Sequence, residues 1–225
     1  MRRRGAGLES YRRTALPESS TDWRTAPFCA LDLELTGLDP RRDEIISFAV
    51  VPIQRGSVQL GRIVAGYVRP EQKMSEPAIR IHGIRPADLE DAAAAPDALE
   101  PLFAALAGRV PVVHCAAVER TFLRRALRGT GVRVHKQMVD TQLLGRLWRY
   151  ERDGILTRAP DLAELAASLS LPVHRQHDAA TDALTTAQVF IALASLLERH
   201  EPQSVGRLCG AERRVANLRA FAPGS

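Results

Sequence analysis

Cysteine is scarce in this sequence, and long apolar runs are absent. The three cysteines, Cys29, Cys115 and Cys209, are odd in number and far apart in a chain of 225 residues. This pattern matches neither a disulfide framework nor a zinc site built on cysteine pairs, so we expect a reducing, cytoplasmic setting. No apolar stretch approaches the ~18 residues that a membrane-spanning helix needs, and no apolar segment follows the basic residues 1–5 as a secretory signal requires. We therefore expect no membrane partner.

Lysine is nearly absent as well. Lys73 and Lys136 are the only lysines among the 31 basic residues, and the net charge is +5 with a pI near 9.6. This balance favours a polyanionic partner, because arginine is suited to two-pronged contacts with phosphate. A general preference of the source genome for arginine would give the same composition, so the charge alone does not identify the partner.

The length and an ordinary composition, 45% hydrophobic and 25% charged, predict one globular domain with tails. Residues 1–26 are rich in arginine, serine and threonine and have little periodicity, which predicts a mobile basic arm. We place the folded domain at residues 27–200. Residues 201–225 are expected to form a basic extension outside the core, with arginines at Arg207, Arg213, Arg214 and Arg219.

Hydrophobic periodicity predicts an α/β fold in which helices flank a mixed five-stranded sheet. Short polar links join apolar runs at residues 28–35, 45–53 and 58–68, which favours an antiparallel meander because parallel neighbours need a long crossover. After residue 86, helical and extended patterns alternate and add two strands. The expected helices cover residues 98–106, 118–127, 141–150, 162–169 and 181–200, and the later strands cover residues 110–114 and 134–140.

Two carboxylates interrupt the first apolar run. Asp32 and Glu34 lie two residues apart, so on a strand they project from the same face. Burying two neighbouring carboxylates without compensation is unfavourable, and a divalent cation between them removes the objection. The alternative is an exposed strand end that binds nothing.

A second polar cluster precedes the last expected helix of the domain. Asp178 or Thr181 can cap that helix, and Asp182 lies in its first turn, where the helix dipole favours a carboxylate. Each of these residues therefore has a purely structural interpretation. His177 is expected in the loop that enters the helix, where a histidine is usually a solvated one.

The order of these parts is informative where each part alone is weak. A strand carries Asp32-x-Glu34, a strand-to-helix unit carries Glu119 after His114, and a final helix is preceded by His177 five residues before Asp182. In this order the chain resembles the DEDDh family of 3′–5′ exonucleases, which includes the proofreading epsilon subunit of bacterial DNA polymerase III, ribonuclease T and oligoribonuclease. It is most similar to the epsilon-like members. The matching stretches are residues 31–37, 81–84, 114–123, 140–141 and 177–183, and the resemblance covers about residues 27–200.

The resemblance implies a ribonuclease-H-like fold and a metal-dependent reaction. Asp32, Glu34, Glu119 and Asp182 would hold two Mg²⁺ or Mn²⁺ ions, since hard cations take oxygen ligands. His177 would take the proton from the attacking water, because imidazole titrates near neutral pH. The product would be a nucleoside 5′-monophosphate, released one at a time from a 3′ end.

Two positions depart from the family pattern. The family's second motif usually has an asparagine and then an aspartate, where this chain has Cys115 and Glu119. Glutamate is one methylene longer and can still reach a metal directly or through water. The change from aspartate to glutamate affects how fully the second metal site is occupied. A surface glutamate without a role is the structural alternative.

Four further residues are candidates for contact with the substrate. Leu35 and Leu38 would pack on the terminal base, the backbone of Thr36 would contact the terminal nucleotide, and His82 matches a contact position of epsilon-like relatives or stabilises the following turn. Asp140 and Thr141 are interpreted as a helix cap, and His114 as an inner histidine. Apolar contacts of this kind accept any base.

The expected substrate is the 3′ end of a single-stranded nucleic acid, with DNA favoured over RNA and a DNA polymerase as a possible partner. Two alternatives stay open. One is an exoribonuclease similar to ribonuclease T or oligoribonuclease. The other is a non-catalytic module that binds a polymerase or nucleic acid, which the presence of all four acidic positions disfavours. A metal-independent hydrolase is poorly supported, because the sequence has no Ser-His-Asp or Cys-His arrangement in the required order.

Overall fold

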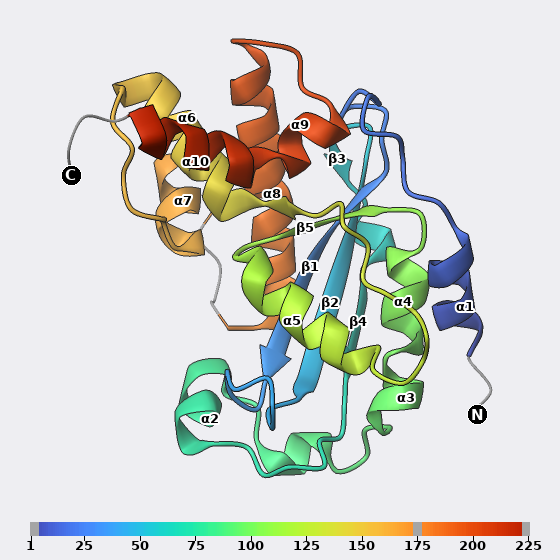
Figure 1. The fold of residues 1–225 in the computed structure, drawn as a ribbon. Helices are drawn as coiled ribbons and strands as arrows, with labels where there is room; N and C mark the ends of the chain where they lie inside the picture. The colour runs from blue at the N-terminus through green and yellow to red at the C-terminus, as the bar shows by residue number, and fades with distance from the viewer. Residues whose placement is uncertain (1–4, 173–176, 222–225) are drawn as a thin grey trace.

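A single apolar strand, β1 (Phe28–Leu35), forms the centre of a six-stranded sheet in the computed structural model, which describes residues 5–172 and 177–221. Seven of its eight residues are buried, because helices cover both faces of the sheet (Figure 1). The strand order is β3-β2-β1-β5-β6, and β4 pairs with β2. The expected mixed α/β sheet with flanking helices is confirmed.

On one side, β1 forms an antiparallel pair. β2 (Ile45–Gln54) pairs with the whole of β1, and a bulge lies between Glu34 and Leu35. The single strand expected at residues 58–68 is wrong, because it is divided into β3 (Ser57–Val58) and β4 (Val64–Tyr67). Between them the chain tightens into the short helix η1 (Leu60–Arg62). This division accounts for six strands where five were expected.

The other side of β1 is parallel. β5 (Val110–Val113) pairs with β1, and β6 (Val139–Asp140) pairs with β5. β6 has two residues, far fewer than the expected strand at 134–140. The reason is that the backbone N–H of His135 donates to the hydroxyl of Tyr11 at 3.1 Å, so this segment bonds to the N-terminal part of the chain instead of extending the sheet.

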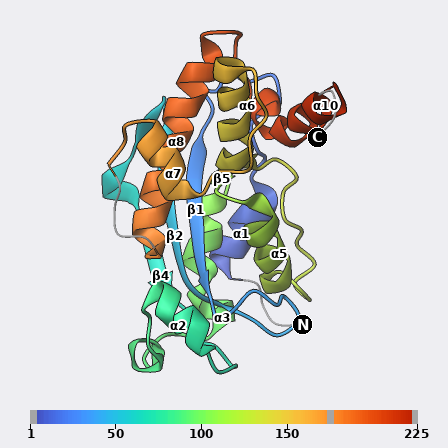
Figure 2. The same ribbon diagram turned by 90° about the vertical axis from the view of Figure 1, so that its left-hand side faces the viewer.

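Helices form one layer on each face of the sheet (Figure 2). On one face α8 packs directly on β1 and β2 and is flanked by α6 and α7. On the other face lie α1, α4 and α5. The expectation that no stretch is long and apolar enough to cross a membrane is wrong for α8 by length and composition, and half of that stretch is buried inside the fold. The bounds are α1 (Ala6–Arg13), α2 (Glu76–His82), η2 (Pro86–Leu89), α3 (Ala95–Ala98), α4 (Glu100–Leu106), α5 (Ala116–Ala126), α6 (Thr141–Asp153), α7 (Leu162–Ser168) and α8 (Ala179–Glu198).

The N-terminal segment, where we expected a mobile arm, is packed on the domain from residue 5 onwards. Tyr11 on α1 is 1% exposed and lies against Phe103, with ring centroids 5.5 Å apart. Trp23 is also 1% exposed and packs edge-on against Phe190, while its indole N–H donates to Glu198 at 2.9 Å. Large aromatic side chains bury enough area to hold a segment that has no regular periodicity.

The C-terminal segment is likewise part of the fold and not an appendage. It forms α9 (Val205–Cys209) and α10 (Ala211–Phe221), and α10 lies across α6 (Figure 1). Its apolar residues recur every three or four positions and enter the core, while the arginines lie outside this stripe. The buried residues are Val205, Leu208, Ala211 and Val215.

The two flanking segments also bond to each other. The backbone N–H of Trp23 donates to the carbonyl of Gln203, and the N–H of Val205 donates to the carbonyl of Thr21. The partner of each segment lies far away along the chain, so the periodicity within one segment could not predict these hydrogen bonds.

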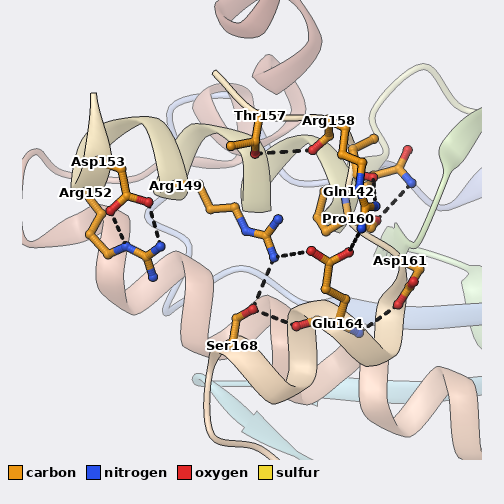
Figure 3. A network of polar contacts seen from close by, with 11 residues as sticks. Gln142, Arg149, Arg152, Asp153, Thr157, Arg158, Pro160, Asp161, Glu164 and Ser168 are labelled. Carbon is orange, nitrogen blue, oxygen red and sulfur yellow. Dashed lines mark hydrogen bonds and ion pairs between the residues drawn. The ribbon is translucent and has the colours of Figure 1, made fainter. Parts of the chain in front are cut away.

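A polar network ties α6 to α7 (Figure 3). Arg149 on α6 forms an ion pair of 3.0 Å with Glu164 on α7 and donates to the hydroxyl of Ser168 at 3.1 Å. Arg158 pairs with the other oxygen of Glu164 at 2.8 Å. The side chain of Arg149 is only 11% exposed, so this pair is shielded from water more than a surface ion pair is. The network fixes α7, which precedes the segment leading to His177.

Replacement of Trp23 by alanine tests the packing of the N-terminal segment. Loss of a buried tryptophan costs about 3–5 kcal/mol, so the Trp23→Ala variant is expected to unfold on the order of 10 °C below the wild type. Thermal unfolding followed by circular dichroism gives the measurement, with the exposed Arg13→Ala as the matched control. An unchanged melting temperature for Trp23→Ala would mean that the segment is not packed.

Candidate active site

Three of the four predicted acids meet at one point. One carboxylate oxygen from each of Asp32, Glu34 and Asp182 lies within 4.8 Å of the others. Asp32 and Glu34 project from the face of β1 that α8 covers, and Asp182 lies in the first turn of α8. The period of two along β1 and the packing of α8 on that strand therefore create the cluster.

The start of α8 holds its acids through backbone bonds. Asp178 caps the helix, because its carboxylate accepts the N–H of Thr181 at 3.0 Å and the hydroxyl of Thr181 at 2.9 Å. Asp182 accepts the backbone N–H of His177 at 2.8 Å. His177 has a positive φ of 62° and an exposed side chain. Its main chain is thus fixed beside the cluster while its imidazole is open to solvent.

Glu119, the fourth acid, is 5% exposed and lies in the first turn of α5. It is outside the group of three carboxylates within 4.8 Å. Burial, and next the charge of Asp32, raises the pKa of Glu119 well above its usual range. Its Oε2 atom is buried and has no hydrogen-bond partner. A buried carboxylate oxygen without a partner is unfavourable and fits a site that is completed by a cation.

Burial and mutual repulsion act on all members of the cluster. Burial, and next the charge of Glu34, raises the pKa of Asp32 well above its usual range. Burial and the charges of Asp182 and Asp178 raise the pKa of Glu34 to about 7. Burial also raises the pKa of Asp182. Each carboxylate makes ionisation of the others less favourable. A hard divalent cation offsets this repulsion, because it binds carboxylate oxygens.

Asp140 sets the start of α5. Its carboxylate accepts the backbone N–H groups of Cys115 at 3.3 Å and Ala116 at 2.8 Å, and also that of Gln142 at 2.9 Å. One side chain therefore caps both α5 and α6, which confirms the expected cap and extends it to a second helix. Cys115 has φ of 73°, a left-handed conformation that favours glycine or asparagine. The sequence carried no signal for this second role, because Asp140 and α5 are far apart along the chain.

The inner histidine of the second motif is held from the same junction. The ring Nδ1 of His114 lies 2.9 Å from the hydroxyl of Thr141, which donates to the carbonyl of Val113 at 3.1 Å. Burial lowers the pKa of His114. These contacts keep His114 as a neutral partner of the fold and leave it outside the acid cluster.

The candidate substrate residues differ in accessibility. Leu38 is 76% exposed, whereas Leu35 is buried. Thr36 is fully buried, and its hydroxyl donates to Asp43 at 3.1 Å while its backbone bonds to Glu44. The hydroxyl and the backbone N–H of Thr36 thus already have hydrogen-bond partners within the protein.

The two ring nitrogens of His82 have different surroundings. Nδ1 accepts the N–H of Ile84 at 3.0 Å, which stabilises the turn at Gly83. Nε2 is buried and has no hydrogen-bond partner. Sequence reasoning missed Ser75, which caps α2 and donates to the carbonyl of Thr36 at 3.2 Å. Ser75 therefore joins α2, and with it His82, to the end of β1.

The sequence profile of the RNase_T family, described as exonuclease, matches residues 29–190. The chain belongs to the exonuclease family. It contains all four acidic positions of the motifs quoted above, and the family resemblance is confirmed.

Among known relatives, this exonuclease domain is 30% identical over 183 residues to a DNA polymerase III PolC-type protein of Thermotoga petrophila. That match covers 80% of this chain and 13% of the relative. This chain is also 28% identical over 215 residues to a DNA polymerase III subunit epsilon-like protein of Rhodobacter capsulatus, and that match covers 95% of this chain and 29% of the relative. The chain thus spans less than a third of the length of either relative.

Solved structures share the fold of this exonuclease domain. Exonuclease X in complex with 5′ overhanging duplex DNA superposes with a TM-score of 0.63 at 20% identity, covering 82% of this chain and 98% of that one. The nuclease domain of 3′hExo, a DEDDh family member bound to rAMP, gives a TM-score of 0.61 at 18% identity with the same coverage. The expected ribonuclease-H-like architecture is confirmed.

The raised carboxylate pKa values predict how pH and a divalent cation change stability. Glu34 holds its proton more tightly in the folded chain, with a pKa of about 7 against 4.5 when unfolded. Its contribution to stability is therefore complete below about pH 4.5 and is lost as pH rises through about 7. We expect the metal-free exonuclease domain to melt at a lower temperature at pH 8 than at pH 5.5, and Mg²⁺ to restore stability mainly at pH 8.

Glu34→Gln is the matched variant for this pH test. Removing one of the repelling charges, worth on the order of 1 kcal/mol, is expected to raise the metal-free melting temperature at pH 8 by about 2–4 °C and to weaken the effect of Mg²⁺. Differential scanning calorimetry with a chelator or with Mg²⁺ gives the comparison. Equal melting temperatures for the wild type and Glu34→Gln at pH 8 would argue against a repulsive cluster.

Proposed function

We propose that this chain is a metal-dependent 3′–5′ exonuclease that releases nucleoside 5′-monophosphates from DNA 3′ ends. The observation that carries the proposal is the meeting of Asp32, Glu34 and Asp182 within 4.8 Å, with the unpartnered Glu119 beside Asp32. These four carboxylates would hold two Mg²⁺ or Mn²⁺ ions. When bound, such ions neutralise the charge of the phosphodiester and activate water for an in-line displacement.

The protein's own part in the reaction is to hold charge and to move a proton. Three of the acids lie on rigid elements, β1 and α8, so the position of the scissile phosphate is set by the core of the domain. The exposed imidazole of His177 would accept the proton of the attacking water. Its backbone bond to Asp182 keeps the ring near the acids without making the ring itself a ligand.

The terminal nucleotide would be held by residues at the end of β1 and on α2. Leu38 offers an exposed apolar surface to the base, and the buried Leu35 is the last residue of β1. The buried Nε2 of His82 lacks a protein partner, so it can meet a polar group of the nucleotide. Thr36 would contribute by fixing the backbone at this end of β1, because its carbonyl accepts both the hydroxyl and the N–H of Ser75.

Support for DNA as the substrate comes from the relatives named as DNA polymerase III proteins. A role in proofreading or repair, with a polymerase as partner, follows as part of the same proposal. The second candidate, an exoribonuclease, is favoured by the structural neighbour that carries rAMP. End-labelled DNA and RNA strands of identical sequence, with a free or a blocked 3′-hydroxyl, distinguish these activities.

Removal of a single acid tests the assignment of the site. Asp32→Asn and Asp182→Asn are expected to lower Mg²⁺-dependent release of mononucleotides by more than about 100-fold, the upper limit for loss of a merely supporting contact. Asp153→Asn, an exposed acid at the end of α6, is the control. Release is measured on end-labelled single strands with Mg²⁺, Mn²⁺ or a chelator. Wild-type turnover in either site variant would contradict the proposed site.

His177→Asn separates the imidazole from the backbone contact. Asparagine tolerates a positive φ and retains the N–H that binds Asp182, so the fold and the acid cluster should persist. We expect the rate to fall by about 10²–10⁴-fold, the usual contribution of a general base, with Mg²⁺ affinity nearly unchanged in titration calorimetry. A large loss of Mg²⁺ affinity would instead make the ring a ligand.

A further inference from the structure

A pocket lies between α5 and the C-terminal segment. Its volume is about 330 Å³. One wall is the outer face of α5, and the opposite wall is the junction of α9 and α10 with the end of β6. The polar residues that line it are Arg120, Thr121, Arg124, Asp140, Cys209 and Glu212.

The register of the sheet places this pocket close to the candidate active site. Ala30 pairs with Val112, and Val112 pairs with Val139. Asp32 and Asp140 therefore lie near the same level, two strands apart, which corresponds to about 10 Å. Because β1, β5 and β6 run parallel, their carboxyl ends share one edge of the sheet. The pocket and the acids lie along that edge.

Arg120 and Arg124 both line this pocket. Among the described residues neither one has an ion pair or a hydrogen bond to the protein, and the Nε atom of Arg120 is buried without a partner. In contrast, Arg125 on the same helix pairs with Glu44 at 3.4 Å. The buried Nε of Arg120 is unfavourable without a hydrogen-bond acceptor, and a bound anion would supply one.

The two acids of the pocket, Asp140 and Glu212, keep their charge but form no ion pair with these arginines. The carboxylate of Asp140 is occupied by backbone N–H groups of α5 and α6. Glu212 is exposed in the first turn of α10 and has no ion pair among the described residues. It weakens the attraction for an anion without blocking the two arginines.

We propose that this pocket is a subsite for the phosphodiester backbone of the nucleic-acid strand, bound away from the end that is cleaved. A guanidinium group can bind a phosphate through two N–H donors at once, and contacts to phosphate carry no sequence information, so the subsite accepts any sequence. The inference rests on the proposed function, because the strand end must lie at the acid cluster. α5 links the two sites, since Glu119 lies near enough to Asp32 for their charges to interact, while Arg120, the next residue, lines the pocket.

The double variant Arg120→Gln/Arg124→Gln tests the subsite. Hydrogen bonds to charged groups are each worth about tenfold in affinity, so the dissociation constant for a fluorescent 20-nucleotide single strand should rise at least about tenfold. Fluorescence anisotropy in the presence of a chelator measures this value without catalysis. The salt dependence of binding should also flatten, by about 0.7 in logarithmic slope for each phosphate contact that is lost.

Two further variants make the result specific to the pocket. Glu212→Gln removes the opposing charge and should tighten binding, a change of opposite sign that a merely structural effect would not give. Arg62→Gln, an exposed arginine on η1 at the other edge of the sheet, should leave binding unchanged. Arg124→Gln alone, at an exposed position, keeps the test valid if loss of Arg120 disturbs folding.

Hydrolysis of a p-nitrophenyl ester of thymidine 5′-monophosphate, which is too small to reach the pocket, separates the subsite from the chemistry. The double variant should keep wild-type kinetics on this ester while its KM for the 20-nucleotide strand rises. Equal strand affinity in the double variant and the wild type would overturn the subsite, as would equal losses on both substrates. A wild type that binds the strand through Arg120 and Arg124 but cleaves neither substrate would overturn the proposed function alone.

Discussion

Repulsion among the carboxylates at the end of β1 is the constraint on which the rest of this structure depends. Asp32, Glu34 and Asp182 are held within 4.8 Å of one another by elements that cannot move apart, and Glu119 adds a fourth charge next to Asp32. Charges placed in this way oppose folding unless protons or cations compensate them. The sheet must therefore be stable enough to hold a site that, by itself, favours unfolding.

The fold meets this constraint with a buried scaffold and with backbone donors. α8 packs on β1 and β2 along much of its length, so the acids at its N-terminus are fixed to the core. The N-terminus of a helix carries partial positive charge, which favours both Asp178 and Asp182 there. The N–H groups of Thr181 and His177 then satisfy individual carboxylate oxygens. Cation binding would have to relieve only the charge that remains.

Much of the site was predictable because its signals are local. The spacing of Asp32 and Glu34 on an apolar strand places both on one face whatever the rest of the chain does. The positions of Asp182 in the first turn of a helix and of Asp140 at a strand-to-helix junction were likewise predictable from the local sequence. Distances between these elements were not predictable from spacing. They depend on the packing of α8 and α5 on the sheet, and only the family resemblance indicated that they meet.

The failures of sequence reasoning share a cause, which is that the decisive partners are remote. Trp23 is held by Phe190 and Glu198, and Tyr11 by Phe103 and His135. A segment judged by its own composition, rich in arginine and serine, gives no sign of these contacts. The helical spacing of Val205 and Leu208 was a signal that the arginines of the same segment obscured.

The two departures from the family motif act on one helix end, and the structure relates them. Cys115 has a left-handed backbone and offers no side-chain cap to α5, where the family's asparagine is better suited to that conformation. Asp140 supplies the missing cap from β6. The start of α5 is therefore fixed from a neighbouring strand and not from its own motif. Glu119, one turn further on, lies near Asp32 on a helix whose start Asp140 fixes.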